Sequence, residues 1–160
     1  QYTLESLLRN DVLAQKYAGG YALIFRLTVD DYHRYCYADS GVKSDNRFVP
    51  GKLHTVRPVA LAAGPVFTQN CREITVMDTQ RFGPVTQVEV GAMLVGKIHN
   101  HHGAGPIIRG QEKGLFLYGG STVILLLEKG RVALQPALLE ASARGEETPV
   151  KMGQALGKAC

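Results

Sequence analysis

Cysteine is scarce in this sequence of 160 residues, and no two cysteines form a CxxC pair. The three cysteines stand far apart, at Cys36, Cys71 and Cys160. An odd number at such spacing argues against a disulfide framework and favours reduced thiols. We therefore expect a cytoplasmic protein.

Long apolar runs and targeting signals are also missing. No stretch reaches the 18 consecutive apolar residues that a membrane-spanning helix needs, so no such helix is expected. The first residues do not have the pattern of a signal peptide. The sequence begins with Gln1 and not with Met, so we expect further residues upstream.

Clustered positive charge is the third absence. Lys and Arg number 18 against 14 Asp and Glu, which gives a formal net charge of +4. The basic residues form no run, and aromatic residues are not interleaved with them. We therefore expect no nucleic-acid partner, whereas the mild excess of positive charge suits contact with an anionic membrane surface.

What remains is typical of one folded domain. The hydrophobic fraction of 45% and the charged fraction of 20% are ordinary values for a globular protein. We see no internal repeat and no linker long enough to divide residues 1–160. Short strand-like runs at even spacing predict a mainly β (α+β) fold, namely a β-sandwich or barrel-like core with an N-terminal helix.

The helix is expected to begin after Thr3 and to end at Gly19 and Gly20. The alternation in residues 72–78 predicts a half-exposed strand, and residues 109–114 are expected to form a polar turn. Including that alternating segment, the expected strands are 21–28, 32–37, 51–56, 72–78, 85–90, 92–98, 115–118 and 123–128.

The sequence Gly119-Gly120-Ser121-Thr122 stands directly before an apolar run at residues 123–127. The glycines allow backbone conformations that other residues avoid. Because Gly120 has no side chain, the Ser121 hydroxyl has an open approach to the carbonyl before it. Taken alone, these residues are most simply a Gly-Gly turn before a buried strand.

Two histidines lie in expected strands. His33 follows an acidic turn, and the alternation places it on the same face as Tyr35 and Tyr37. His54 lies in a second strand, which we consider as a neighbour of the first. A lone histidine is more often a structural group than a catalyst, so neither position defines a site by itself.

Two other kinds of site, a metal site and a hydrolase site, are suggested by single residue types but are not supported by the residues around them. His99, His101 and His102 suggest a metal site, but adjacent histidines point in different directions and no carboxylate or cysteine stands at ligand spacing, so we expect no metal. Ser121 with a histidine suggests a hydrolase, but the G-x-S-x-G elbow is absent.

Several segments, in order along the chain, resemble the motifs of phosphatidylserine decarboxylases. No single segment is specific, but their common order is. They are Arg26 to Arg34 (R-L-x-x-x-D-Y-H-R), Gly51 to Val56 (G-x-L-x-x-V), Phe67 to Arg72 (F-x-x-N-x-R), Asp78 to Gly83, Val90 to Gly96, Gly110 to Phe116 (G-x-x-x-G-x-F) and Gly119 to Thr122, which resembles the processing site.

The resemblance implies a proenzyme that cuts itself between Gly120 and Ser121. Residues 1–120 would become the β chain and residues 121–160 the α chain, and the two would stay associated. Ser121 would become a pyruvoyl group, a covalent electron sink that makes pyridoxal phosphate and a metal unnecessary. Its ketone would react with the substrate amine and draw electrons from the bond to the departing carboxylate.

The resemblance also implies roles for the residues around His33, which is the best candidate to return a proton to the substrate carbon. Asp31 or Tyr32 would orient it or would simply hold the turn. Many family members have a second histidine where this sequence has Cys36, and that histidine is the base for self-cleavage. A thiol is a poor base unless its pKa is lowered, so His33 or His54 is considered for this role.

The implied reaction converts phosphatidylserine to phosphatidylethanolamine, by an enzyme peripheral to the inner face of the membrane. A homo-oligomer is compatible with the sequence. Two alternatives stay open: a related decarboxylase of a free amino acid such as tryptophan, and a non-catalytic β-sandwich binding domain.

Overall fold

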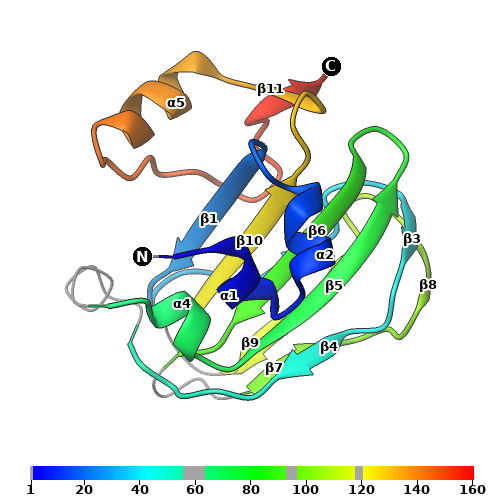
Figure 1. Cartoon of the computed structure of the whole chain (residues 1–160), viewed down its shortest axis with the longest axis vertical. Coiled ribbons are helices and arrows are strands. Elements are labelled where there is room, and N and C mark those ends of the chain that lie inside the picture. Colours follow the sequence, from blue (N-terminus) through cyan, green and yellow to red (C-terminus); the bar gives the residue numbers. More distant parts are fainter. Residues whose placement is uncertain (1, 56–63, 93–96, 118–120) are drawn as a thin grey trace.

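The computed structural model describes residues 2–55, 64–92, 97–117 and 121–160. The fold is mainly β, with several antiparallel sheets and a few short helices, which confirms the expected class (Figure 1). The described helices are α1 (Leu4–Leu8), α2 (Asp11–Lys16), α4 (Val66–Gln69) and α5 (Pro136–Ala143). The strands are β1 (Tyr21–Leu27), β2 (Arg34–Cys36), β3 (Gly41–Lys43), β4 (Arg47–Val49), β5 (Arg72–Thr79), β6 (Gly83–Val90), β7 (Lys97–Asn100), β8 (Gly105–Ile107), β9 (Glu112–Leu117), β10 (Ser121–Leu127), β11 (Val132–Leu134) and β12 (Gly157–Ala159).

The largest sheet has seven strands in the order β1-β10-β6-β5-β3-β8, and β4 also pairs with β5. β10 lies inside this sheet, antiparallel to β1 on one side and to β6 on the other. A second sheet has the order β2-β9-β7, and β11 pairs with β12. β10 is therefore held by main-chain hydrogen bonds along both of its edges.

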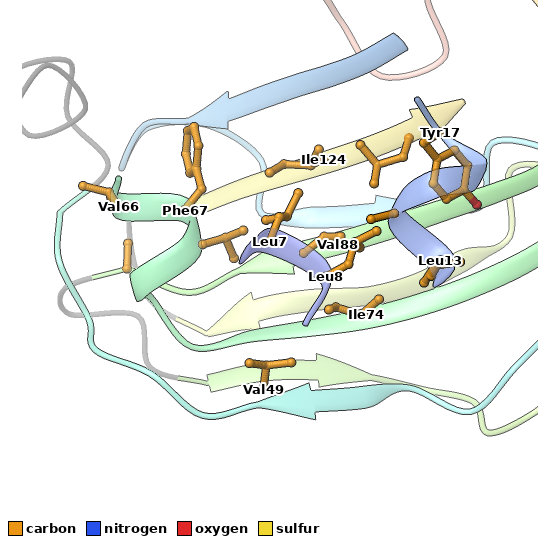
Figure 2. Packing of buried hydrophobic residues seen from close by; sticks show 14 residues of the cluster. Leu7, Leu8, Leu13, Tyr17, Val49, Val66, Phe67, Ile74, Val88 and Ile124 are labelled. Carbon is orange, nitrogen blue, oxygen red and sulfur yellow. The ribbon is translucent and has the colours of Figure 1, made fainter. Parts of the chain in front are cut away.

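Both faces of the large sheet are covered around β10. Ile124 and Leu126 of β10 belong to a core cluster with side chains of α1, α2 and α4 (Figure 2). Val123, which points to the opposite face, packs with Tyr35 and Phe116 of the three-stranded sheet. The expected sandwich-like core therefore includes a helical layer on one side.

This covering corrects the prediction of a half-exposed strand at residues 72–78. β5 lies beneath the helices on one face and opposite the second sheet on the other, so only Asp78 in the strand is exposed. Alternation in the sequence distinguishes an apolar face from a polar one, but a polar face can itself be buried when its groups find partners.

The N-terminal segment forms two short helices and not the single helix that was expected. Arg9 adopts a left-handed conformation with φ of 47°, which ends α1. Asn10 then begins α2 by accepting a hydrogen bond from the main-chain N–H of Leu13. The break lets Leu8 and Leu13 both reach the core, because the two helices turn against the same sheet (Figure 2).

Other strand predictions were too long or displaced. The expected strand 32–37 contracts to β2, and residues 51–55 form an isolated bridge at Lys52 with Asn70. The polar turn expected at residues 109–114 is shorter than predicted, because β9 already begins at Glu112. The expected strand 92–98 falls partly on residues outside the described ranges, and β7 begins at Lys97.

Arg72 of β5 connects the helical layer to the sheet by hydrogen bonds. Its guanidinium is completely buried and donates to the carbonyls of Ser6 and Leu7 at the end of α1, at 2.9 and 2.7 Å. It also donates to the carbonyls of Thr68 and Asn70 around the end of α4, at 3.0 and 2.9 Å. A single side chain thus satisfies main-chain carbonyls at two helix ends.

Replacing Arg72 by methionine, which keeps the length of the side chain, should destabilise the fold. The lost hydrogen bonds to a charged donor leave buried carbonyls unsatisfied, so the free energy of unfolding should fall by about 2–4 kcal/mol. Urea unfolding of Arg72→Met measures this loss. Arg131→Met, at an exposed arginine paired with Glu128, is the control and should change stability by less than about 0.5 kcal/mol. Equal stability of the two variants would contradict the assignment.

Candidate active site

Ser121 is the first residue of β10 and is fully buried. It lies opposite Leu27, the last residue of β1. Since side chains alternate along a strand, Ser121 points to the same face as Val123, into the space between the two sheets. Its Oγ has no hydrogen-bond partner within the described residues. A buried hydroxyl without a partner is costly, which marks this serine as a candidate reacting group.

The residue before Ser121 is not part of this geometry. Gly119 and Gly120, the predicted turn and cleavage residue, lie outside the described residues. Thr122 is also fully buried, and its Oγ1 has no partner among the residues that the structure describes, but it points to the face that carries the helices, as Ile124 does. The two neighbouring hydroxyls therefore face different layers of the molecule.

One ring nitrogen of His33 is hydrogen-bonded, and the other has no partner within the part of the chain that the structure describes. Its Nδ1 lies 2.7 Å from the main-chain carbonyl oxygen of Asp31. A carbonyl only accepts, so Nδ1 carries the proton and Nε2 of the neutral ring has the lone pair. Nε2 is buried and has no partner within the described residues. The ring therefore presents a proton acceptor to the interior.

The two residues expected to orient His33 or to hold its turn differ in their contacts. Asp31 contacts the ring through its main-chain carbonyl, while its carboxylate accepts the Thr28 N–H at 2.6 Å. That hydrogen bond lowers the pKa of Asp31 from its ordinary value. Tyr32 is 64% exposed. The turn, and not a carboxylate–imidazole pair, sets the orientation of the ring.

The topology places His33 and Ser121 at the same end of the molecule. β1 ends at Leu27, opposite Ser121, and the chain then turns through residues 28–32 to His33. The main-chain carbonyl of His33 accepts the N–H of Phe116 at 2.9 Å. Phe116 lies near the end of β9, the strand that leads toward Ser121. His33 is thus hydrogen-bonded to β9, the last described strand before the candidate cleavage site.

His54 is anchored at this end of the sheet through Asn70. Its main-chain N–H donates to Asn70 Oδ1 at 2.9 Å, and Asn70 Nδ2 donates to the His54 carbonyl at 2.8 Å. Asn70 Nδ2 also donates to the carbonyl of Gly91, which follows β6 where Val90 lies opposite Thr122. The His54 side chain is exposed, and its segment does not pair with β2 as considered from the sequence.

Cys36 lies in β2, opposite Glu112 of β9, and is half-buried. Burial raises the pKa of its thiol, so the thiol is protonated near neutral pH and is a poor base. This environment favours the interpretation of Cys36 as a structural residue.

The histidine cluster joins an ion pair on the outer side of the second sheet. His101 Nε2 lies 2.6 Å from Glu112, and the rings of His99 and His101 are 5.2 Å apart. Among the described residues, no group of three or more His, Cys, Asp or Glu is placed to hold a metal. Nor does the part of the chain that the structure describes include a helix long and apolar enough to cross a membrane.

Sequence reasoning missed two groups of buried polar residues at this end. Asn70 and Arg72 stood in a recognised motif, but no role was inferred for them. Glu89 and Lys113 form a fully buried ion pair between the sheets. The sequence of β6 gave no clear signal of this pair, because its alternation puts Glu89 on the polar side of the strand, where a glutamate is normally exposed.

The fold and site define a β-rich chain with a buried serine at the start of an internal strand and a histidine held beside the preceding strand. A sequence model of phosphatidylserine decarboxylase matches residues 1–158. The chain is 45% identical over 157 residues to phosphatidylserine decarboxylase proenzyme 2 of Clostridium acetobutylicum, covering 98% of this chain and 54% of that protein. It is 43% identical over 159 residues to the phosphatidylserine decarboxylase proenzyme of Chlamydia muridarum, covering 98% and 53%.

The chain therefore belongs to the phosphatidylserine decarboxylase family. It spans about half the length of the curated relatives that it matches.

Proposed function

We propose that this chain is the catalytic part of a phosphatidylserine decarboxylase, which cuts itself between Gly120 and Ser121 and converts phosphatidylserine to phosphatidylethanolamine. The observation that carries the proposal is the buried hydroxyl of Ser121 at the first position of β10, which has no hydrogen-bond partner among the described residues. Relatives named as proenzymes of this activity support it.

Self-cleavage begins with attack of Ser121 Oγ on the Gly120 carbonyl carbon. The Gly120–Ser121 C–N bond breaks as an ester forms. A base then removes the Ser121 Cα proton, and elimination breaks the Oγ–Cβ bond. This step leaves a carboxylate on Gly120 and a dehydroalanine at position 121. Addition of water and loss of ammonia leave the pyruvoyl group on the new chain.

The surroundings of Ser121 fit such a group. Its Oγ is buried without a partner within the described residues, and Val123, on the same face of β10, packs with Tyr35 and Phe116 of the second sheet. Once formed, the pyruvoyl group supplies an electron-withdrawing carbonyl that stabilises negative charge as the substrate carboxylate leaves. Neither pyridoxal phosphate nor a metal is part of this proposal.

His33 is the proposed proton carrier. With Nδ1–H committed to the Asp31 carbonyl, Nε2 accepts a proton and afterwards donates it to the substrate carbon. The base for self-cleavage is His33 or His54, since burial keeps the Cys36 thiol protonated. Asp31 supports the ring through its main-chain carbonyl, and we assign no role to the exposed Tyr32.

The proposed products, residues 1–120 and 121–160, should remain associated. β10 begins the second product and lies between β1 and β6 of the first. Its register pairs Ser121 to Leu127 with β1, and it buries Ile124 and Leu126 in the core. A cut before Ser121 therefore leaves an internal strand bound on both edges.

The proposed place of action is the cytoplasmic side of a membrane, because a substrate with two acyl chains stays in the bilayer. The formal charge of +4 favours contact with an anionic lipid surface. Assembly into a homo-oligomer is compatible with this arrangement.

The full-length protein tests the proposal directly. With phosphatidylserine vesicles it should release CO2, and borohydride added with the substrate should trap a covalent amine adduct on the chain that begins at residue 121. Vesicles of phosphatidylcholine alone are the control. Release of CO2 from free tryptophan and not from the vesicles would instead show that the protein is an amino-acid decarboxylase. If neither substrate formed an adduct, the result would favour the third alternative, a non-catalytic binding domain.

A further inference from the structure

A buried polar cluster joins the two sheets. Lys113 Nζ donates to Glu89 Oε1 at 2.8 Å and to Asn100 Oδ1 at 2.7 Å. Asn100 Nδ2 donates to Glu73 Oε2 at 2.5 Å and to Glu89 Oε2 at 3.2 Å. Glu89 and Lys113 are completely buried. We call these four residues the inter-sheet cluster, since Glu73 and Glu89 belong to the large sheet and the other two to the small one.

An irregularity in the small sheet turns Lys113 inward. Tyr35 lies opposite Gly114, but Cys36 lies opposite Glu112, so Lys113 is an extra residue between the two pairs. Such a bulge changes the direction of a side chain. Glu112 points outward, to Arg34 and His101, while Lys113 enters the space between the sheets.

The cluster is connected through neighbouring strands to both candidate reacting residues. Glu89 is opposite Val123 in β10, so Ser121 is its diagonal neighbour on the same face, at about 7–8 Å by ordinary sheet geometry. On the other side, β9 continues from Lys113 to Phe116, whose N–H holds the carbonyl of His33. The cluster thus connects the strand next to Ser121 with the strand that fixes His33.

Stability alone does not account for such a pair. The cost of removing both charges from water roughly cancels their attraction, and apolar residues of similar size often replace a buried ion pair without loss. Burial raises the pKa of Glu89, and Lys113 acts against that change. What the hydrogen bonds determine is the relative position of the two sheets.

We propose that the inter-sheet cluster is a positioning device, which holds the sheet that fixes His33 in place against the strand that begins at Ser121 and so sets the rate of self-cleavage. The inference rests on the proposed function. Glu89 and Lys113 are positioning residues, because they act through β10 and β9 and not on the reacting atoms.

The test removes both charges together, so that neither is left unpaired. Glu89→Met/Lys113→Met in the full-length protein should keep a thermal midpoint within a few degrees of the wild type. Its self-cleavage, followed by intact mass well below that midpoint, should slow by about 10- to 100-fold, because small displacements of reacting groups have effects of this size. Glu89→Gln/Lys113→Gln also removes both charges but keeps hydrogen-bonding amides in the cluster, so it should retain most of the wild-type rate.

The control is Glu112→Gln, which removes a charge from the outer face of the same strand and should cleave at the wild-type rate. Wild-type cleavage in the double methionine variant would overturn the inference, as would Glu89→Gln/Lys113→Gln cleaving as slowly as the methionine variant. If the double methionine variant does not fold, Asn100→Ala is used instead, because it removes only the bridging amide. Wild-type cleavage in Asn100→Ala would then refute the positioning role of the cluster. A wild-type protein that does not cleave would refute the proposed function instead.

Discussion

Ser121→Ala in the full-length protein should give one uncut chain with no decarboxylase activity. Alanine has no hydroxyl to attack the preceding carbonyl, so no ester and no pyruvoyl group can form. Intact-mass analysis checks this result. The wild-type protein should show two chains, the second beginning at residue 121, resistant to Edman degradation and lighter by one ammonia than a chain that begins with serine.

Thr122→Val is the matched control for this variant. It removes a neighbouring hydroxyl that is equally buried and equally without a partner among the described residues, but that points to the helical face. It should still cut itself. An unmodified single chain in the wild-type protein, or cleavage in Ser121→Ala, would remove Ser121 from the proposed role.

His33→Gln should lower the turnover number of processed enzyme by about 10²–10⁴-fold, the range for loss of a general acid–base group. The amide cannot exchange a proton near neutral pH, although it can keep a hydrogen bond to the Asp31 carbonyl. Turnover is measured as CO2 release per pyruvoyl group, which separates decarboxylation from incomplete self-cleavage. Wild-type turnover in this variant would refute the role of His33.

The comparison with His54→Gln identifies the base for self-cleavage. If His33 is that base, only His33→Gln should slow the appearance of the two chains, and if His54 is, only His54→Gln should. His99→Gln, at an exposed histidine of β7, is the control and should affect neither step. If all three variants cut themselves at the wild-type rate, neither His33 nor His54 is the base for self-cleavage.

Local patterns in the sequence were sufficient for the elements near the site. The apolar run after Ser121 predicted β10, and residues 21–28 predicted β1 almost to the residue, because branched and aromatic side chains at strand length are a local signal. The ordered motifs also indicated the family, which the comparisons established. Arg9 shows the limit of local patterns, since nothing in the apolar spacing predicted a left-handed residue that breaks the helix.

The sequence by itself determined the β-rich class, the family and the serine and histidine on which the proposed chemistry depends. Only the tertiary structure decided what surrounds them. Asn70 fixes the segment of His54 through contacts between distant residues, and the partner of the buried Glu89 is Lys113 on another sheet. Such pairings depend on strand register and on a bulge in β9, which long-range hydrogen bonding sets and which local periodicity does not encode.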